Sequence, residues 1–308
     1  NMINCNTGLP QLQERRQGAF RLLNDAEKFI RDSLKKWNPG LLTYDYNGDG
    51  RNEYIAQMER FSAILSCAGG QVFSFNAVKG GADYAAGLSK NEYFDGKSDR
   101  YQRAFFSDRI SCAADEEDYV SLSDYVERKF DYRRNEVQLE TVACLSREQL
   151  PVLVRKNIDF NSSGIVVQYI LKNCSDREIN AVFSSEINFS QTRFERNPSG
   201  FQYGVELIQN ENRIQLEGEK PSGFKYRKSS GVSVVLVKDV KEKRSFVIEP
   251  NENCGLESSL EEFMRPGHDG SPCLSSTSLC QRLFWNIRLD AGREVEKTVS
   301  LTYVPSKK

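Results

Sequence analysis

Segment 45–53 carries the residues best spaced for chemistry, because side-chain oxygens recur at alternate positions. It runs Asp45-Tyr46-Asn47-Gly48-Asp49-Gly50-Arg51-Asn52-Glu53. In a calcium loop, alternate side chains turn onto one hard cation and a glycine permits the sharp bend. The segment resembles the first half of such a loop, but Ala56 stands where the final bidentate glutamate would be. Asp, Asn and Gly also form ordinary turns. Two hypotheses therefore stand: a Ca²⁺ site formed by Asp45, Asn47, Asp49 and Glu53, and a turn that binds no ion.

A second group of candidates lies on the predicted strand 182–189. Side chains alternate between the two faces of a strand, so Ser184, Glu186 and Asn188 share one face, opposite Phe183, Ile187 and Phe189. A row of hydrogen-bonding side chains on a sheet can contact sugar hydroxyls. Glu186 and Asn188 are therefore candidate substrate-binding residues, and an ordinary solvated face is the alternative.

The histidine and cysteine content narrows the chemistry further. The only histidine, His268, lies in a turn-rich segment, which argues against a Ser-His-Asp triad and a histidine zinc site. None of the eight cysteines forms a CxxC pair. We expect buried free thiols in a reducing compartment, for example at Cys67 and Cys174, with a local disulfide among Cys254, Cys273 and Cys280 as the alternative. No catalytic residue is assigned, and no cofactor is required beyond the Ca²⁺ hypothesis.

Charge and hydropathy exclude several classes of partner. The 308 residues include 42 Lys and Arg against 43 Asp and Glu, a net charge of -1. This balance argues against a protein held to nucleic acid or to a membrane surface by long-range charge. No run approaches the roughly 20 apolar residues of a membrane span, and the first residues show no signal-peptide core. We expect a cytoplasmic protein with no nucleic-acid or membrane partner.

The elements that would position these residues fall into two regions. Residues 1–40 are expected to form a helical segment, because apolar residues recur with helical period from Leu12 to Trp37 and Asn38-Pro39-Gly40 ends the helix. The apolar stripe of this helix must pack on the rest of the chain or on another domain.

Residues 41–308 form a β-sandwich domain, because their pattern changes to period two. Segment 250–278 is expected to be a long irregular loop with one helical turn at 256–264. Many short strands without interleaved helices predict a mainly β, antiparallel sandwich with an N-terminal helical segment. The predicted strands are Tyr54–Ile64, Gln71–Val78, Val137–Cys144, Gly164–Leu171, Ile179–Phe189, Gly231–Val240, Ser245–Ile248, Leu283–Leu289 and Val295–Val304.

Six motifs in this order resemble the C-terminal part of the glycoside hydrolase family 57 amylases and 4-α-glucanotransferases. The resemblance runs from about residue 19 to residue 304. The motifs are the helix at 21–30, the acidic Gly turn at 45–53, Gly69-Gly70-Gln71-Val72-Phe73-Ser74-Phe75, segment 101–109, Glu186-Ile187-Asn188-Phe189 and Trp285-Asn286-Ile287-Arg288-Leu289-Asp290-Ala291-Gly292. The chain departs from the family pattern at Asp108-Arg109, where Asp-His is expected, and in the long 250–280 segment.

This resemblance implies a helical connector followed by a galactose-mutarotase-like β-sandwich. In the family the sandwich follows a catalytic barrel that carries the glutamate nucleophile and the aspartate acid/base, so no catalytic residue carries over to this chain. The implied function is to brace that barrel domain and contact an α-glucan or maltooligosaccharide. The alternatives are an autonomous carbohydrate-binding module and, less favoured because of the single histidine, a sugar mutarotase-type enzyme.

Overall fold

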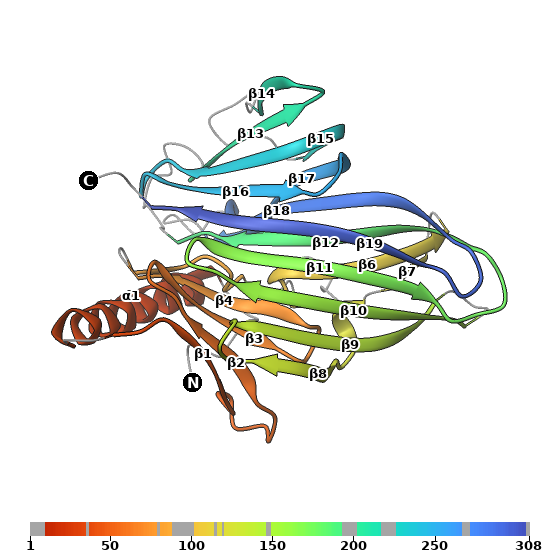
Figure 1. The fold of residues 1–308 in the computed structure, drawn as a ribbon. Helices are drawn as coiled ribbons and strands as arrows, with labels where there is room; N and C mark the ends of the chain where they lie inside the picture. The colour runs from red at the N-terminus through yellow and green to blue at the C-terminus, as the bar shows by residue number, and fades with distance from the viewer. Residues whose placement is uncertain are drawn as a thin grey trace.

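The computed structural model describes residues 10–34, 37–78, 81–87, 102–113, 116–118, 120–145, 149–192, 202–216, 226–266 and 272–305. These residues form one helix, α1 (Pro10–Ser33), and antiparallel strands folded into two packed layers (Figure 1). The predicted mainly β, antiparallel sandwich with an N-terminal helix is confirmed. None of the described helices is long and apolar enough to cross a membrane.

Layer 1 is an antiparallel sheet in which each strand pairs with the next one across the sheet. From one edge to the other it consists of β1 (Gly40–Tyr44), β2 (Glu53–Gln57), β3 (Phe61–Ser66), β4 (Gln71–Ala77), β6 (Phe105–Ala113), β12 (Ile179–Ser190), β18 (Pro272–Leu289) and β17 (Cys254–Pro266). Three short elements, β5 (Ala82–Asp83), β7 (Glu116–Asp118) and the 3₁₀ turn η1 (Val120–Leu122), lie in its connections.

Layer 2 is also antiparallel. It consists of β8 (Val126–Asp131), β9 (Glu136–Leu145), β10 (Leu150–Phe160), β11 (Gly164–Asn173), β19 (Glu294–Val304) and β16 (Arg244–Pro250). The long strand β15 (Tyr226–Asp239) joins the layers, because its first half pairs with β17 and its second half with β16. The hairpin β13 (Tyr203–Gln209) and β14 (Asn212–Leu216) continues the sheet beyond β15.

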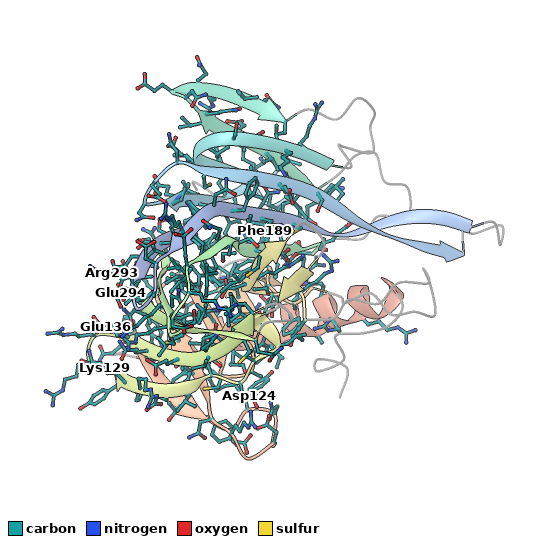
Figure 2. The ribbon with its side chains drawn as sticks, turned by 90° about the vertical axis from the view of Figure 1, so that its right-hand side faces the viewer. Asp124, Lys129, Glu136, Phe189, Arg293 and Glu294 are labelled. Carbon is teal, nitrogen blue, oxygen red and sulfur yellow. The ribbon has the colours of Figure 1, made fainter. Side chains whose placement is uncertain are left out.

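An aromatic cluster fills the space between the layers. Phe75 and Phe189 of layer 1 meet Phe246 of layer 2 at ring-centroid distances of 5.8 and 5.0 Å. Tyr303 of layer 2 lies 5.9 Å from Phe75. Phe189 occupies the centre of the molecule in Figure 2. Trp285 is also buried in this core.

A buried ion pair crosses the same space. Lys156 on β10 of layer 2 pairs with Asp108 on β6 of layer 1, and neither side chain is exposed. The Lys156 ammonium also donates hydrogen bonds to the carbonyls of Gly70 (2.6 Å) and Phe106 (3.1 Å). One cation therefore holds the β3–β4 turn and strand β6 of layer 1 to the middle of layer 2.

The 250–278 segment corrects the sequence prediction. Its residues 254–266 and 272–278 belong to strands β17 and β18, which pair with each other, and do not form an irregular loop with a helical turn. Its Ser and Glu content hides the strand alternation, because some polar side chains point inward. Ser258 faces the core and accepts a hydrogen bond from Gln281 (2.6 Å). The predicted strand 54–64 is likewise two strands, β2 and β3, which turn between Gln57 and Phe61.

Helix α1 docks on layer 1 through its polar side, so its apolar stripe does not pack on the rest of the described chain. Gln17 donates to the Asp83 carbonyl (2.8 Å), Arg21 to the Thr192 carbonyl (2.6 Å) and Asn24 to the Asn76 side chain (3.1 Å). Phe20 adds a large apolar side chain to the docked side. Figure 2 shows α1 on the side of the sandwich to which the β17–β18 hairpin extends.

The ion pair makes the first testable prediction. Replacing Lys156 with Met leaves the Asp108 carboxylate buried without its cation, so K156M should lower the free energy of unfolding by about 3–5 kcal/mol. The matched control is K129M, because Lys129 forms an exposed pair with Glu136 (3.0 Å) whose loss should cost no more than about 1 kcal/mol. Urea denaturation measures both. Equal losses in the two variants would contradict the assigned role of Lys156.

Candidate functional site

The two sequence-predicted sugar contacts lie on the outer face of layer 1, but below the surface. Glu186 is 1% exposed and pairs with Arg109 on β6. Asn188 is fully buried and donates a hydrogen bond to the Ala104 carbonyl (3.1 Å). This face of β12 is therefore not the solvated face that the alternative interpretation supposed. Sugar binding by Glu186 and Asn188 stays a prediction.

Charged residues continue this face towards the edge of layer 1. Arg282 of β18 lies directly opposite Glu186 in the β12–β18 register. Arg282 pairs with Glu257 of β17 (3.2 Å), which pairs in turn with Lys228 of β15 (2.9 Å). The row alternates in sign and becomes more exposed towards Lys228, so its charges are largely balanced within the protein.

The acidic 45–53 loop is an ordered turn whose oxygens accept hydrogen bonds from backbone N–H groups. Asp45 accepts from Gly48 (2.8 Å) and Gly50 (3.0 Å), and Asn47 accepts from Asp49 (2.9 Å). Glu53 is buried and accepts from the Tyr46 N–H (2.9 Å). Within the described ranges, no three His, Cys, Asp or Glu side chains gather closely enough to hold a metal ion. Calcium binding here stays a prediction.

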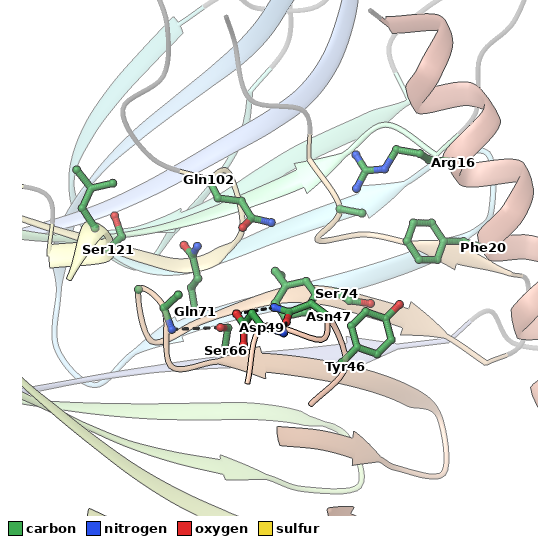
Figure 3. A pocket seen from close by; sticks show the side chains of 15 residues that line it. Arg16, Phe20, Tyr46, Asn47, Asp49, Ser66, Gln71, Ser74, Gln102 and Ser121 are labelled. Carbon is green, nitrogen blue, oxygen red and sulfur yellow. Dashed lines mark hydrogen bonds between the residues drawn. The ribbon is translucent and has the colours of Figure 1, made fainter. Parts of the chain in front are cut away.

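The same loop forms one wall of a pocket of about 390 Å³, which we call the α1–β4 pocket (Figure 3). The pocket lies between α1, the 45–53 loop, the β3–β4 hairpin and η1. Its described lining is Arg16, Phe20, Tyr46, Asn47, Asp49, Ser66, Ala68, Gly69, Gln71, Phe73, Ser74, Ala86, Gln102, Ser121 and Leu122. Its volume falls in the usual range of small-molecule sites.

Two polar side chains of the α1–β4 pocket, Gln71 and Ser121, have hydrogen-bonding groups that are free to contact a ligand. Gln71 accepts a hydrogen bond from Ser107 (2.8 Å) at its side-chain oxygen, which leaves its NH₂ group as a donor on the pocket side (Figure 3). Ser121 is 5% exposed, and its hydroxyl has no hydrogen-bond partner among the described residues. Buried polar groups normally have partners. An unsatisfied hydroxyl in a pocket wall therefore points to a ligand or to water.

Aromatic rings line the pocket beside these groups. The rings of Tyr46 and Phe73 lie 6.2 Å apart at an angle of 50°, and Phe20 reaches in from α1 (Figure 3). Burial, together with the charges of Asp83 and Glu53, raises the pKa of Tyr46, so this phenol is neutral at ordinary pH. The pocket thus offers apolar ring surface and neutral hydrogen-bonding groups together.

The Gly69-Gly70 turn supports the pocket wall from the core side. Both glycines have positive φ, +75° and +54°, and Lys156 binds their carbonyls from beneath. A Cβ on Gly69 would lie 2.4 Å from the Ser121 carbonyl oxygen. This turn joins the paired strands β3 and β4. The pocket itself was missed, because its walls come from segments more than 100 residues apart.

The cysteine prediction is partly corrected. Cys254 and Cys280, for which a local disulfide was the alternative, are buried free thiols. Cys174 is exposed and Cys67 half-buried, although both adjoin apolar runs. The single histidine, His268, lies outside the described residues.

Comparisons with known proteins agree with this architecture. The family model "Alpha-amylase/4-alpha-glucanotransferase, C-terminal" matches residues 91–221, which confirms the predicted resemblance to the C-terminal part of amylases and 4-α-glucanotransferases. The 4-α-glucanotransferase of Thermococcus litoralis is similar over 96% of this chain, with 16% identity and a TM-score of 0.70. This chain spans only 42% of that enzyme's length.

Smaller proteins share the sandwich. A galactose mutarotase-like protein of Clostridium acetobutylicum matches 86% of this chain and 99% of its own, with 11% identity and a TM-score of 0.57. A galactose mutarotase related enzyme of Lactobacillus acidophilus matches 83% of this chain and 98% of its own, with 9% identity and a TM-score of 0.55. These likenesses establish the fold. A search of curated protein sequences found no match.

Two glycine substitutions test the role of the turn in shaping the pocket. Gly48 and Gly69 have nearly equal φ, +77° and +75°, but a Cβ on Gly48 meets nothing within 4 Å. G48A should therefore cost only the backbone strain of positive φ, about 1–2 kcal/mol. G69A should cost about 1–3 kcal/mol more, because its methyl group clashes with the Ser121 carbonyl. Urea midpoints measure the difference. Equal midpoints for G48A and G69A would contradict the expected clash, because they would show that η1 moves aside at no measurable cost in stability.

Proposed function

We propose that this chain, whose residues 91–221 match the C-terminal domain of α-amylases and 4-α-glucanotransferases, serves as the β-sandwich domain of an α-glucan-processing enzyme of the glycoside hydrolase family 57 kind. Its role is to support a catalytic domain, on the same polypeptide or on a separate one. The chemistry would take place on that domain, so no residue of this chain is assigned to catalysis.

The outer side of α1 is the observation that carries this proposal. Leu22 and Phe29 are 74% and 75% exposed, and Leu23, Ile30 and Leu34 are each more than half exposed. Spacings of one, four and seven residues place them on one stripe of the helix. A contiguous exposed apolar stripe of this kind is typical of an interaction surface.

The comparison with the Thermococcus enzyme supports one occupant for this stripe. That enzyme is more than twice as long as its region that matches this chain. The matched region includes all but 4% of this chain, so the rest of that enzyme lies outside the region that this chain matches. We assign the α1 stripe to a catalytic domain that would correspond to this remaining length. The helix already uses its opposite, polar side to bind its own sandwich, so the stripe is available for such a partner.

The surface can be tested in the isolated chain. L22E and F29E should reduce binding of a hydrophobic fluorescent dye, while the free energy of unfolding stays within about 0.5 kcal/mol, because both side chains are largely exposed. The control K28Q changes the net charge by the same single unit at an exposed position off the stripe. Equal dye binding by all three variants would contradict the assignment.

The function is tested on the native protein. An antibody against this chain should isolate from its source cells a polypeptide or complex that hydrolyses or transfers α-glucan, and the isolated assembly should contain more than these 308 residues. In that assembly F29E should weaken the attachment of the catalytic domain and K28Q should not. A native chain of this size alone, without α-glucan activity, would refute the proposal.

A further inference from the structure

We propose that the α1–β4 pocket binds one glucose unit of an α-glucan at a non-catalytic site. The pocket combines aromatic surface with closely placed hydrogen-bonding groups, and its described lining carries one positive and one negative side chain, Arg16 and Asp49. The glucan identity rests on the proposed function. The inference of a neutral sugar rests on the pocket alone.

The lining fits a sugar ring better than an anion or a purely apolar ligand. A sugar presents an apolar ring face together with hydroxyls that both donate and accept hydrogen bonds. Tyr46 and Phe73 supply aromatic surface for the apolar face of the sugar ring. Gln71 supplies an oriented NH₂ donor, and the buried Ser121 hydroxyl has no partner among the described residues. A site for an anion would need a surplus of positive charge, but Asp49 offsets Arg16.

Other polar surfaces of the described residues fit less well. The row around Glu186 is buried against its own counter-charges. A second pocket on the outer face of layer 2 holds Gln138, Asn157 and Gln168, but its side-chain amides bind one another at 2.8 Å and no aromatic side chain is among its described lining. Of these described surfaces, the α1–β4 pocket alone joins rings, an unsatisfied hydroxyl and an oriented donor.

Hydrogen bonds from neighbouring residues also fix the groups that line the pocket. Lys156 fixes the Gly69-Gly70 turn, Ser107 fixes Gln71, and Asp83 accepts a hydrogen bond from the wall residue Ser74 (2.7 Å). Helix α1 completes the far wall with Arg16 and Phe20 (Figure 3). A ligand would therefore meet groups that are already oriented, which lowers the entropic cost of binding.

Saturation-transfer NMR with maltotriose tests the proposal on this 308-residue chain. We expect transfer to the sugar protons, with affinity lowered about three- to tenfold by Q71L, the loss expected for one neutral hydrogen bond. Y46A should weaken binding similarly, while Y46F, which keeps the ring, should restore most of it. Q168L and Y132A are matched controls outside the pocket and should bind maltotriose like the unsubstituted protein.

Each failure has a separate meaning. Because Gln71 is buried, urea midpoints check that Q71L folds, and N47A on the exposed loop provides a second pocket variant. No transfer to maltotriose, or binding that Q71L, Y46A and N47A leave unchanged, would overturn the site. Displacement of maltotriose by inorganic phosphate would overturn the neutral-sugar assignment, and tighter binding of cellotriose would overturn the α-glucan assignment. These measurements do not test the supporting role, which the variants of the α1 stripe test separately.

Discussion

The buried Lys156–Asp108 pair is the interaction on which the other features of this protein depend. A charge with no exposed surface is tolerated only if its partners are fixed in place. In this protein the partners are a carboxylate, two glycine carbonyls and the carbonyl of Phe106, a residue whose φ is +63°. All of them belong to layer 1, whereas Lys156 belongs to layer 2. The register between the layers and the shape of the β3–β4 turn are therefore set together.

The need to give every buried polar group a partner also explains the other polar residues in the core between the layers. Besides Lys156, the Ser185 hydroxyl bonds the Tyr169 hydroxyl between the layers (2.8 Å), and Gln281 bonds Ser258. Each pair satisfies groups that would otherwise be costly to bury. Polar pairs also select one register, because sliding a strand by one residue would leave both members unsatisfied. Specific pairing of the long β17–β18 hairpin thus rests partly on residues that look out of place in a core.

These polar core residues also set the limit of sequence-based prediction. In strands such as 164–171 and 179–189 apolar and polar side chains alternate clearly. The order of motifs was enough to predict the sandwich and its resemblance to the C-terminal part of amylases and 4-α-glucanotransferases. The prediction for 250–278 was wrong because polar residues such as Ser258, which bonds Gln281 in the core, interrupt the apolar face on which alternation relies. The helix was predicted, but its docked side was not, since Gln17, Arg21 and Asn24 share one helix face yet are polar, and a search for an apolar face does not find them. The pocket could not be predicted, because Arg16, Gln71 and Ser121 become neighbours only in the folded chain.

Helix α1 links the two surfaces to which we assign function. Its docked side is held by a few directed hydrogen bonds and by Phe20, and so gains little from apolar burial. Its free side carries the large apolar residues, and covering them would contribute about 25 cal/mol for each Å² removed from water. A catalytic domain on that stripe would therefore hold α1 more firmly than the sandwich does alone. Because Arg16 and Phe20 form the far wall of the α1–β4 pocket, the same contact would stabilise the pocket, and a sugar bound there would in turn favour the docked helix.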